Sequence, residues 1–221
     1  LLANGIEPYA TLYHWDLPQA LQDKGGWYNR DTAHRLADHA EAMARHFGDR
    51  VKHWTTLNEP WTFCWSGHAS GEDAPGLNDG VKGGLAASHH ALLGHGLSVP
   101  RIRAAAPGAE VGIVLDLNVV EPATRNPEDI QAARHFELAQ NRFYLDAVFK
   151  GSYPEDMLAQ SRLTQRQLRA LDDGPVDALL AAGCAAGATL IAAGVLLARV
   201  LKKLVSAAAG EGLVPGRRRA R

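Results

Sequence analysis

Cysteine is nearly absent from this chain of 221 residues, which holds only Cys64 and Cys184. Two cysteines in unrelated segments predict neither a disulfide framework nor a metal–thiolate cluster, so we expect no metal, no other cofactor and a reducing, cytoplasmic compartment. An excess of charge of one sign is also lacking, because the formal net charge is −1. That balance argues against nucleic acid as a partner. The 46% share of hydrophobic residues predicts one soluble globular domain with a sizeable core.

The sequence also lacks a starting methionine, so it predicts nothing about targeting. The chain opens on Leu1 without a methionine, a basic segment or a cleavage signal, and we interpret this start as an internal cut. Charge then divides the chain, since residues 1–160 carry 13 basic and 20 acidic side chains whereas residues 161–221 carry 10 and 4. The first region is therefore net acidic and the second net basic.

Strand-like and helix-like segments alternate through the first region. The expected strands, at residues 7–13, 51–57 and 111–117, are mostly apolar runs, as parallel strands buried on both faces require. Such repeated units predict part of a (β/α)8 TIM barrel or an open doubly wound sheet. Three strands cannot close a barrel by themselves. The unpaired edges of an incomplete barrel would also favour self-association.

Three helices connect or follow these strands. The first should begin after Asp31 as its N-cap and stop at Gly48. Residues 81–106 are helical in character, but Pro100 lies inside them and predicts a break or kink. The third helix begins with the cap Asn126. Its expected apolar face consists of Ala132, Phe136, Ala139, Phe143 and Val148.

From about residue 176 the composition changes. Residues 178–198 contain no charge and are rich in Ala, Gly and Leu, which predicts a C-terminal Ala-rich helix. Their length would allow a membrane span, but alanine and glycine contribute little hydrophobic free energy, so a buried or surface-docked helix is at least as well supported. The basic end at residues 217–221 is typical of a solvated tail. We therefore expect two parts, residues 1–177 and residues 178–221.

The most informative run is Thr-Thr-Leu-Asn-Glu-Pro at residues 55–60, which ends the second expected strand. It places Glu59 at the mouth of a buried strand, directly after Asn58. Burial beside Trp54, Trp61 and Trp65 would disfavour the charged form of this acid, as a general acid at neutral pH requires. Taken alone, such a glutamate is more often a surface residue that ends a strand.

A second polar cluster follows the first expected strand and contains His14, Trp15 and Asp16. Because the carboxyl ends of parallel barrel strands share one face, His14 and Glu59 should converge. A lone histidine is more often a core residue, and tryptophan more often fills a core than stacks on a sugar. Together, however, His, Asn, Glu and tryptophan suit a polyhydroxylated ligand.

These residues belong to longer ordered motifs: Tyr-Ala-Thr-Leu-Tyr-His-Trp-Asp-Leu-Pro at 9–18, Gly-Gly-Trp at 25–27, Val-Lys-His-Trp-Thr-Thr-Leu-Asn-Glu-Pro at 51–60, Ala-Pro-Gly at 74–76 and Ser-His-His at 88–90. With them, residues 1–178 resemble an internal part of a glycoside hydrolase family 1 enzyme of the β-glucosidase type. The resemblance implies a partial (β/α)8 barrel, about strands 3 to 5 of that fold, and a β-glucoside or oligosaccharide as substrate.

The resemblance also implies roles for four residues. Glu59 would be the catalytic general acid/base, and Asn58 would hydrogen-bond the 2-hydroxyl of the sugar. His14 would bind hydroxyls of the non-reducing sugar, and Trp15 would shape the same subsite. Outside this set, we interpret His53 as structural and read the pair at residues 89–90 as packing or surface residues, since no acidic partner stands at metal-ligand spacing.

The second carboxylate of a retaining glycosidase is missing. In the family it stands in a Thr-Glu-Asn-Gly motif, which none of the ten glutamates of this chain matches. Asp116 faces the correct end of the third expected strand but does not match that position. We therefore expect the isolated chain to be inactive, and we hypothesise that the reading frame was lost near residue 178. Rival interpretations are a non-catalytic carbohydrate-binding module and a membrane-associated fragment.

Overall fold

The structure is a computed structural model that describes residues 1–160, and its centre is a three-stranded parallel sheet. The strands are β1 (Tyr9–Tyr13), β2 (His53–Asn58) and β3 (Glu110–Val114), in the order β1-β2-β3. Both neighbouring pairs are parallel. The predicted α/β class with a parallel sheet is confirmed, and the sheet is consistent with part of a barrel. Strand β1, however, is not buried on both faces, because only Tyr13 of its five residues is buried.

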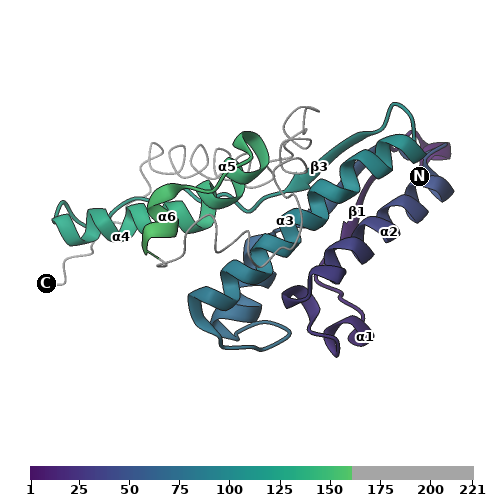
Figure 1. The fold of residues 1–221 in the computed structure, drawn as a ribbon. Coiled ribbons are helices and arrows are strands. Elements are labelled where there is room, and N and C mark those ends of the chain that lie inside the picture. The colour runs from purple at the N-terminus through teal and green to yellow at the C-terminus, as the bar shows by residue number, and fades with distance from the viewer. Residues whose placement is uncertain (161–221) are drawn as a thin grey trace, which may run out of the picture.

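Helices connect and follow the strands (Figure 1). Helices α2 and α3 run side by side along the sheet, and α4, α5 and α6 follow β3 (Figure 1). The helical elements are η1 (Leu2–Asn4), α1 (Gln19–Gln22), η2 (Gly26–Tyr28), α2 (Arg30–Phe47), the π-helix η3 (Thr62–Ser70), α3 (Gly80–Ala105), α4 (Pro127–Glu137), the π-helix η4 (Leu138–Arg142), α5 (Phe143–Lys150) and α6 (Glu155–Gln160).

Strand ends differ from the sequence predictions by up to three residues. Strand β3 stops at Val114, although the apolar run continues to Leu117. Apolar alternation reports burial rather than hydrogen bonding to a neighbour, and Leu115 is buried without belonging to a ladder. Despite these shifts, the polar residues that were predicted to follow the strands still lie at the strand ends.

Helix α2 begins two residues earlier than predicted. The N-cap is Asn29, not Asp31, because the Asn29 side chain accepts a hydrogen bond from the Asp31 backbone N–H at 3.0 Å. Asp31 lies instead in the first turn, where a negative charge favours the helix dipole. The predicted stop at Gly48 is confirmed.

Of the break or kink predicted at Pro100, the break does not occur. Helix α3 continues through Pro100 to Ala105. The proline is exposed, whereas Val99 and Ile102 beside it are buried. Its ring therefore faces solvent, and packing of the opposite side holds the helix together.

The third predicted helix is interrupted. It begins after Asn126 as expected, but the π-helical segment η4 separates α4 from α5. An inserted π turn rotates the residues that follow relative to those before it. As a result Phe143 and Val148 are buried, whereas Phe136 is 47% exposed. The residues that the sequence placed on one apolar face therefore lie on two different faces.

Two core clusters lie along the sheet. One contains residues from the starts of β2 and β3, such as Trp54 and Val111, packed on α2 and α3. The other contains Tyr13, Leu57 and Ile113 from the strand ends. This second cluster supports the edge of the sheet where the chain leaves β1 and β2.

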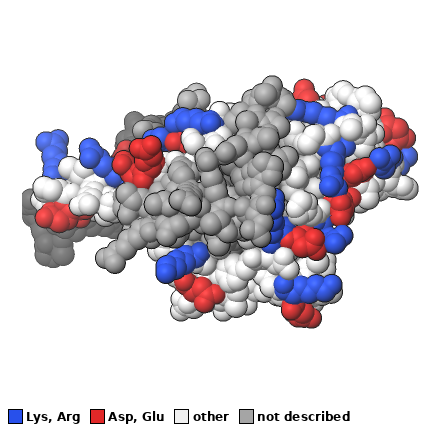
Figure 2. All heavy atoms as spheres, viewed as in Figure 1, with Lys and Arg blue, Asp and Glu red and all other residues white. Residues whose placement is uncertain are grey.

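Charged side chains of both signs are interspersed on the visible surface (Figure 2). Arg101 of α3 donates to a carboxylate oxygen of Asp38 on α2 at 2.5 Å, and this hydrogen bond lowers the pKa of Asp38. No described helix is both long and apolar enough to cross a membrane. The expectations for residues 178–198 and for the basic tail lie outside the described residues.

Candidate active site

Glu59 lies one residue beyond the end of β2 and is half-buried. Its backbone N–H donates to the carbonyl of Val114, the last residue of β3, at 2.9 Å. Its own carbonyl accepts from Thr62 N–H at 3.0 Å. Glu59 is therefore fixed between the carboxyl ends of two neighbouring strands.

His14 and Trp15 lie at the same edge of the sheet, directly after β1. Because Tyr13 pairs with Leu57 in the parallel register, the residues that follow each strand are neighbours. The indole N–H of Trp15 donates to the backbone carbonyl of Asn58 at 2.9 Å. The structure thus brings His14, Trp15, Asn58 and Glu59 to one edge, as predicted from parallel strand geometry.

The two loops have unusual backbones. Trp15 has φ 75° and Glu59 has φ 45°, and they are the non-glycine residues with positive φ in the described part of the chain. This left-handed region is costly for side chains with a Cβ, and such residues often mark functional sites. Both strained residues belong to the predicted site.

Aromatic side chains of the core pack against this edge of the sheet. The Trp27 indole N–H donates to the Tyr13 hydroxyl at 3.1 Å, and Phe63 meets the Tyr13 ring at 5.0 Å between centroids. Burial raises the pKa of the Tyr13 phenol, so it stays neutral. Exposed His14 and the 42% exposed Trp15 extend from this edge toward solvent.

The tryptophans expected around Glu59 do not all lie there. Trp54 belongs to the cluster at the opposite, N-terminal end of the strands, whereas Trp61 and Trp65 pack on the cluster beneath the site. The expectation that three indoles surround Glu59 was therefore wrong for Trp54. Its side chain lies near the beginning of β2, far along the strand from Asn58.

Three histidines outside the site contact other parts of the protein. The ring nitrogens of His53 lie 2.8 Å from Glu7 and 3.2 Å from Glu110, at the N-terminal ends of the strands. His89 contacts the Tyr153 hydroxyl at 2.8 Å, and His90 the Trp27 carbonyl at 2.9 Å. All three serve packing, and residues 1–160 contain no cluster of three or more metal-ligating side chains.

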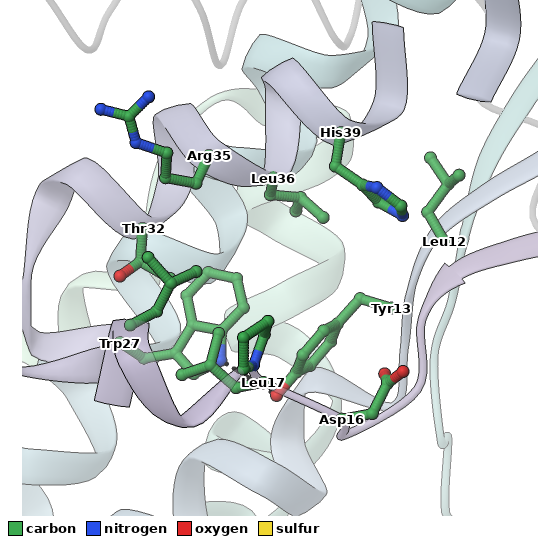
Figure 3. A pocket seen from close by; sticks show the side chains of 11 residues that line it. Leu12, Tyr13, Asp16, Leu17, Trp27, Thr32, Arg35, Leu36 and His39 are labelled. Carbon is green, nitrogen blue, oxygen red and sulfur yellow. Dashed lines mark hydrogen bonds between the residues drawn. The ribbon is translucent and has the colours of Figure 1, made fainter. Parts of the chain in front are cut away.

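A cavity of about 240 Å³ lies between β1 and α2 (Figure 3). Leu12, Tyr13, Leu36 and Trp27 form much of its wall, and Arg35 and His39 come from α2. It contains none of the four predicted site residues. Its apolar lining suits packing better than catalysis.

A second hollow adjoins the site and was missed by the sequence reasoning. It measures about 380 Å³ and is lined by Trp61, Asp116, Phe136 and Gln140, among others. Trp61 follows Glu59 by two residues, and Asp116 follows the Val114 carbonyl that bonds Glu59. We call this hollow the Trp61 cleft. The available signal was Asp116, which stands near the end of the third expected strand.

A family model for glycosyl hydrolase family 1 matches residues 1–181. The chain belongs to this family. Its relatives include β-glucosidase A of Acetivibrio thermocellus, 48% identical over 159 residues that cover 72% of this chain and 35% of that protein. A 1,4-β-D-glucan glucohydrolase of Thermotoga neapolitana is 42% identical over 163 residues, covering 73% and 38%.

Solved structures of family members match the fold as well. The crystal structure of a psychrophilic β-glucosidase from Micrococcus antarcticus aligns with a TM-score of 0.74 and 43% identity, over 81% of this chain and 38% of that one. A family 1 β-glucosidase from Thermotoga maritima aligns at 0.73 with 36% identity, over 85% and 40%. This family 1 chain spans between a third and two fifths of the length of these relatives.

Proposed function

We propose that this chain is the acid/base part of a retaining β-glucosidase-type glycoside hydrolase that acts on O-β-glycosides. Glu59 protonates the leaving oxygen and then activates the water that releases the sugar. The single observation that supports this role is the joined pair of loops, in which Trp15 bonds the Asn58 carbonyl immediately before Glu59. Asn58 and His14 bind the sugar hydroxyls in this proposal.

A retaining reaction needs a nucleophilic carboxylate about 5–5.5 Å from the acid/base. The family's Thr-Glu-Asn-Gly motif does not occur in this sequence. We therefore expect purified residues 1–221 to show no turnover of an aryl β-glucoside. Turnover that disappears in Glu59→Gln would contradict this expectation.

A chimera tests the role of Glu59 directly. Residues 1–157 replace the aligned segment of the Acetivibrio thermocellus β-glucosidase, which supplies the rest of the molecule. We expect the chimera to hydrolyse cellobiose and Glu59→Gln to lower its kcat/KM by roughly 10²–10⁴, the range for loss of a general acid. The matched control is Glu128→Gln, which removes an exposed charge from α4.

The leaving group provides a second readout. An aryl leaving group with a low pKa needs little protonation, so Glu59→Gln should slow the first chemical step less for 4-nitrophenyl β-glucoside than for cellobiose. Equal losses for both substrates would count against an acid role. Full activity of Glu59→Gln on cellobiose would refute the proposal.

A further inference from the structure

His53 lies between two carboxylates at the N-terminal ends of the three strands. Its ring Nε2 lies 2.8 Å from a carboxylate oxygen of Glu7, which precedes the first residue of β1 by two positions. Its Nδ1 lies 3.2 Å from a carboxylate oxygen of Glu110, the first residue of β3. Because His53 itself begins β2, this one ring connects the starts of all three strands.

Both contacts are hydrogen bonds only when the imidazole carries two protons. A carboxylate that is exposed to water is ionised at neutral pH and can only accept hydrogen bonds. A neutral imidazole has one N–H, so it donates to one carboxylate and presents a lone pair to the other. The imidazolium donates from both nitrogens and adds the attraction of its charge. The observed geometry therefore matches the protonated ring.

The other groups around the ring suit a cation. The Tyr9 ring of β1 stacks on His53 with 4.2 Å between centroids and 8° between planes, and an aromatic face attracts a cation. The His53 side chain is only 16% exposed. Among residues 1–160, the charged side chains that contact the ring are the two glutamates. The neighbouring Lys52 donates from its Nζ to the Gly48 carbonyl at 2.7 Å.

We propose that His53 is a proton-dependent clamp that holds the starts of β1, β2 and β3 together. The protonated ring ties Glu7 to Glu110 across β2. When the ring loses a proton, one carboxylate faces a nitrogen lone pair, and the charge that attracted both acids is lost. The clamp therefore stabilises the sheet while the glutamates are ionised and the ring is protonated, and this contribution is lost as the pH rises.

The first test counts the ring protons in residues 1–221 labelled with ¹⁵N at histidine, with the His53 signals assigned from His53→Gln. At pH 5.5 we expect both ring N–H protons of His53 to exchange slowly enough to be observed, because a carboxylate accepts from each. Those of the exposed His39 should exchange too fast. At pH 8.5 only one His53 N–H signal should remain.

Urea unfolding of the full chain measures the contribution of each contact. At pH 5.5, Glu7→Gln and Glu110→Gln should each raise the unfolding equilibrium constant about twofold to fivefold, the range of exposed ion pairs. In the His53→Gln chain both effects should be smaller, because a neutral amide replaces the cation. At pH 8.5 the combined effect of the two glutamate substitutions should be at least about twofold smaller than at pH 5.5.

Glu128→Gln is the matched control, since it removes an exposed glutamate charge from α4 and should have the same effect at both pH values. A single His53 N–H signal at pH 5.5 would overturn the inference. So would glutamate effects that are equal at both pH values or unchanged in the His53→Gln chain. The proton count is made on the unaltered chain, so a misfolded glutamate variant does not remove the test. The clamp lies at the opposite end of β2 from Glu59, and its failure would leave the proposed function untouched.

Discussion

Trp15 and Glu59 each hold a left-handed backbone that costs on the order of 1–3 kcal/mol. The Trp15 indole bond to Asn58 and the Glu59 backbone bond to Val114 oppose that cost. The first bond ties the loop after β1 to the end of β2, and the second ties Glu59 to the end of β3, so each loop is held by the neighbouring strand. At the scale of single residues, the site depends on backbone contacts as much as on side-chain chemistry.

Trp15→Phe removes the indole donor and keeps an aromatic ring. We expect it to lower the free energy of unfolding by about 1 kcal/mol, the net value of one hydrogen bond, as measured by urea unfolding. The control Tyr9→Phe alters an exposed ring on β1, the strand that precedes Trp15, and should have a smaller effect. Equal stability of Trp15→Phe and the unaltered chain would show that the bond contributes nothing.

His95 on α3 is buried, and its Nδ1 lies 2.8 Å from the Thr56 hydroxyl of β2. Burial lowers its pKa to about 4. The unfolded chain, in which the histidine pKa is near 6.5, binds more protons at intermediate pH. Protonation therefore favours unfolding, and stability is lost as pH falls from about 6.5 toward 4.

We expect the free energy of unfolding to decrease over this range by up to about 3 kcal/mol from His95 alone. His95→Gln keeps a polar partner for Thr56 and should flatten the dependence, measured by urea unfolding at pH 7 and pH 5. Burial also lowers the pKa of His68, so part of the slope should remain. The exposed His39→Gln is the control, and an unchanged slope in His95→Gln would contradict the assignment.

At the scale of elements, helix α3 shows how packing overrides local preference. A proline removes one hydrogen bond of the helix and costs about 3 kcal/mol in an interior position. The buried side of α3 packs against α2 and η3, whereas Pro100 faces solvent. The contacts of the whole helix outweigh the lost bond.

Pro100→Ala should restore a donor to the carbonyl of Gly96 and raise the free energy of unfolding by about 1–3 kcal/mol. Thermal unfolding followed by circular dichroism measures the change. Ala104→Gly, at an exposed position in the last turn, serves as a control and should lower stability by at most about 1 kcal/mol. A less stable Pro100→Ala would mean that the ring itself packs favourably.

At the scale of the whole molecule, β1 and β3 each pair with β2 alone in the described residues. Tyr9 at the start of β1 is 57% exposed and stacks on His53 at 4.2 Å between ring centroids. Strands with an unpaired edge readily pair with other chains unless charge or proline blocks them. The expected self-association of this chain follows from that edge.

Sedimentation velocity should show oligomers that grow with concentration, and Tyr9→Lys should shift the distribution toward monomer because edge lysines oppose pairing. Tyr9→Ala loses the same stacking on His53 without adding charge, so it separates the two effects. Equal association of Tyr9→Lys and Tyr9→Ala would mean that β1 is not the contact.

Much of this molecule was predictable from local pattern. Three strands, the stop of α2 at Gly48 and the cap at Asn126 follow from periodicity and turn chemistry. The exceptions are Pro100, where burial of the opposite face decided the outcome, and Phe136, which the π turn of η4 moved out of the core. Neither outcome can be predicted from the sequence of one segment, because each depends on the elements that pack against that segment.

The sequence by itself determined the family through its ordered motifs. It also predicted parallel strands and the placement of Glu59 and His14 at strand ends, since these depend on chain order and hydrophobic period. Tertiary structure alone decided that Trp15 bonds Asn58, that Trp54 lies at the other end of the sheet, and that Gln140 donates to the Asp116 carbonyl. The reason is that hydrogen bonds between distant segments depend on exact side-chain directions, whereas the hydrophobic pattern fixes only which face of each element is buried.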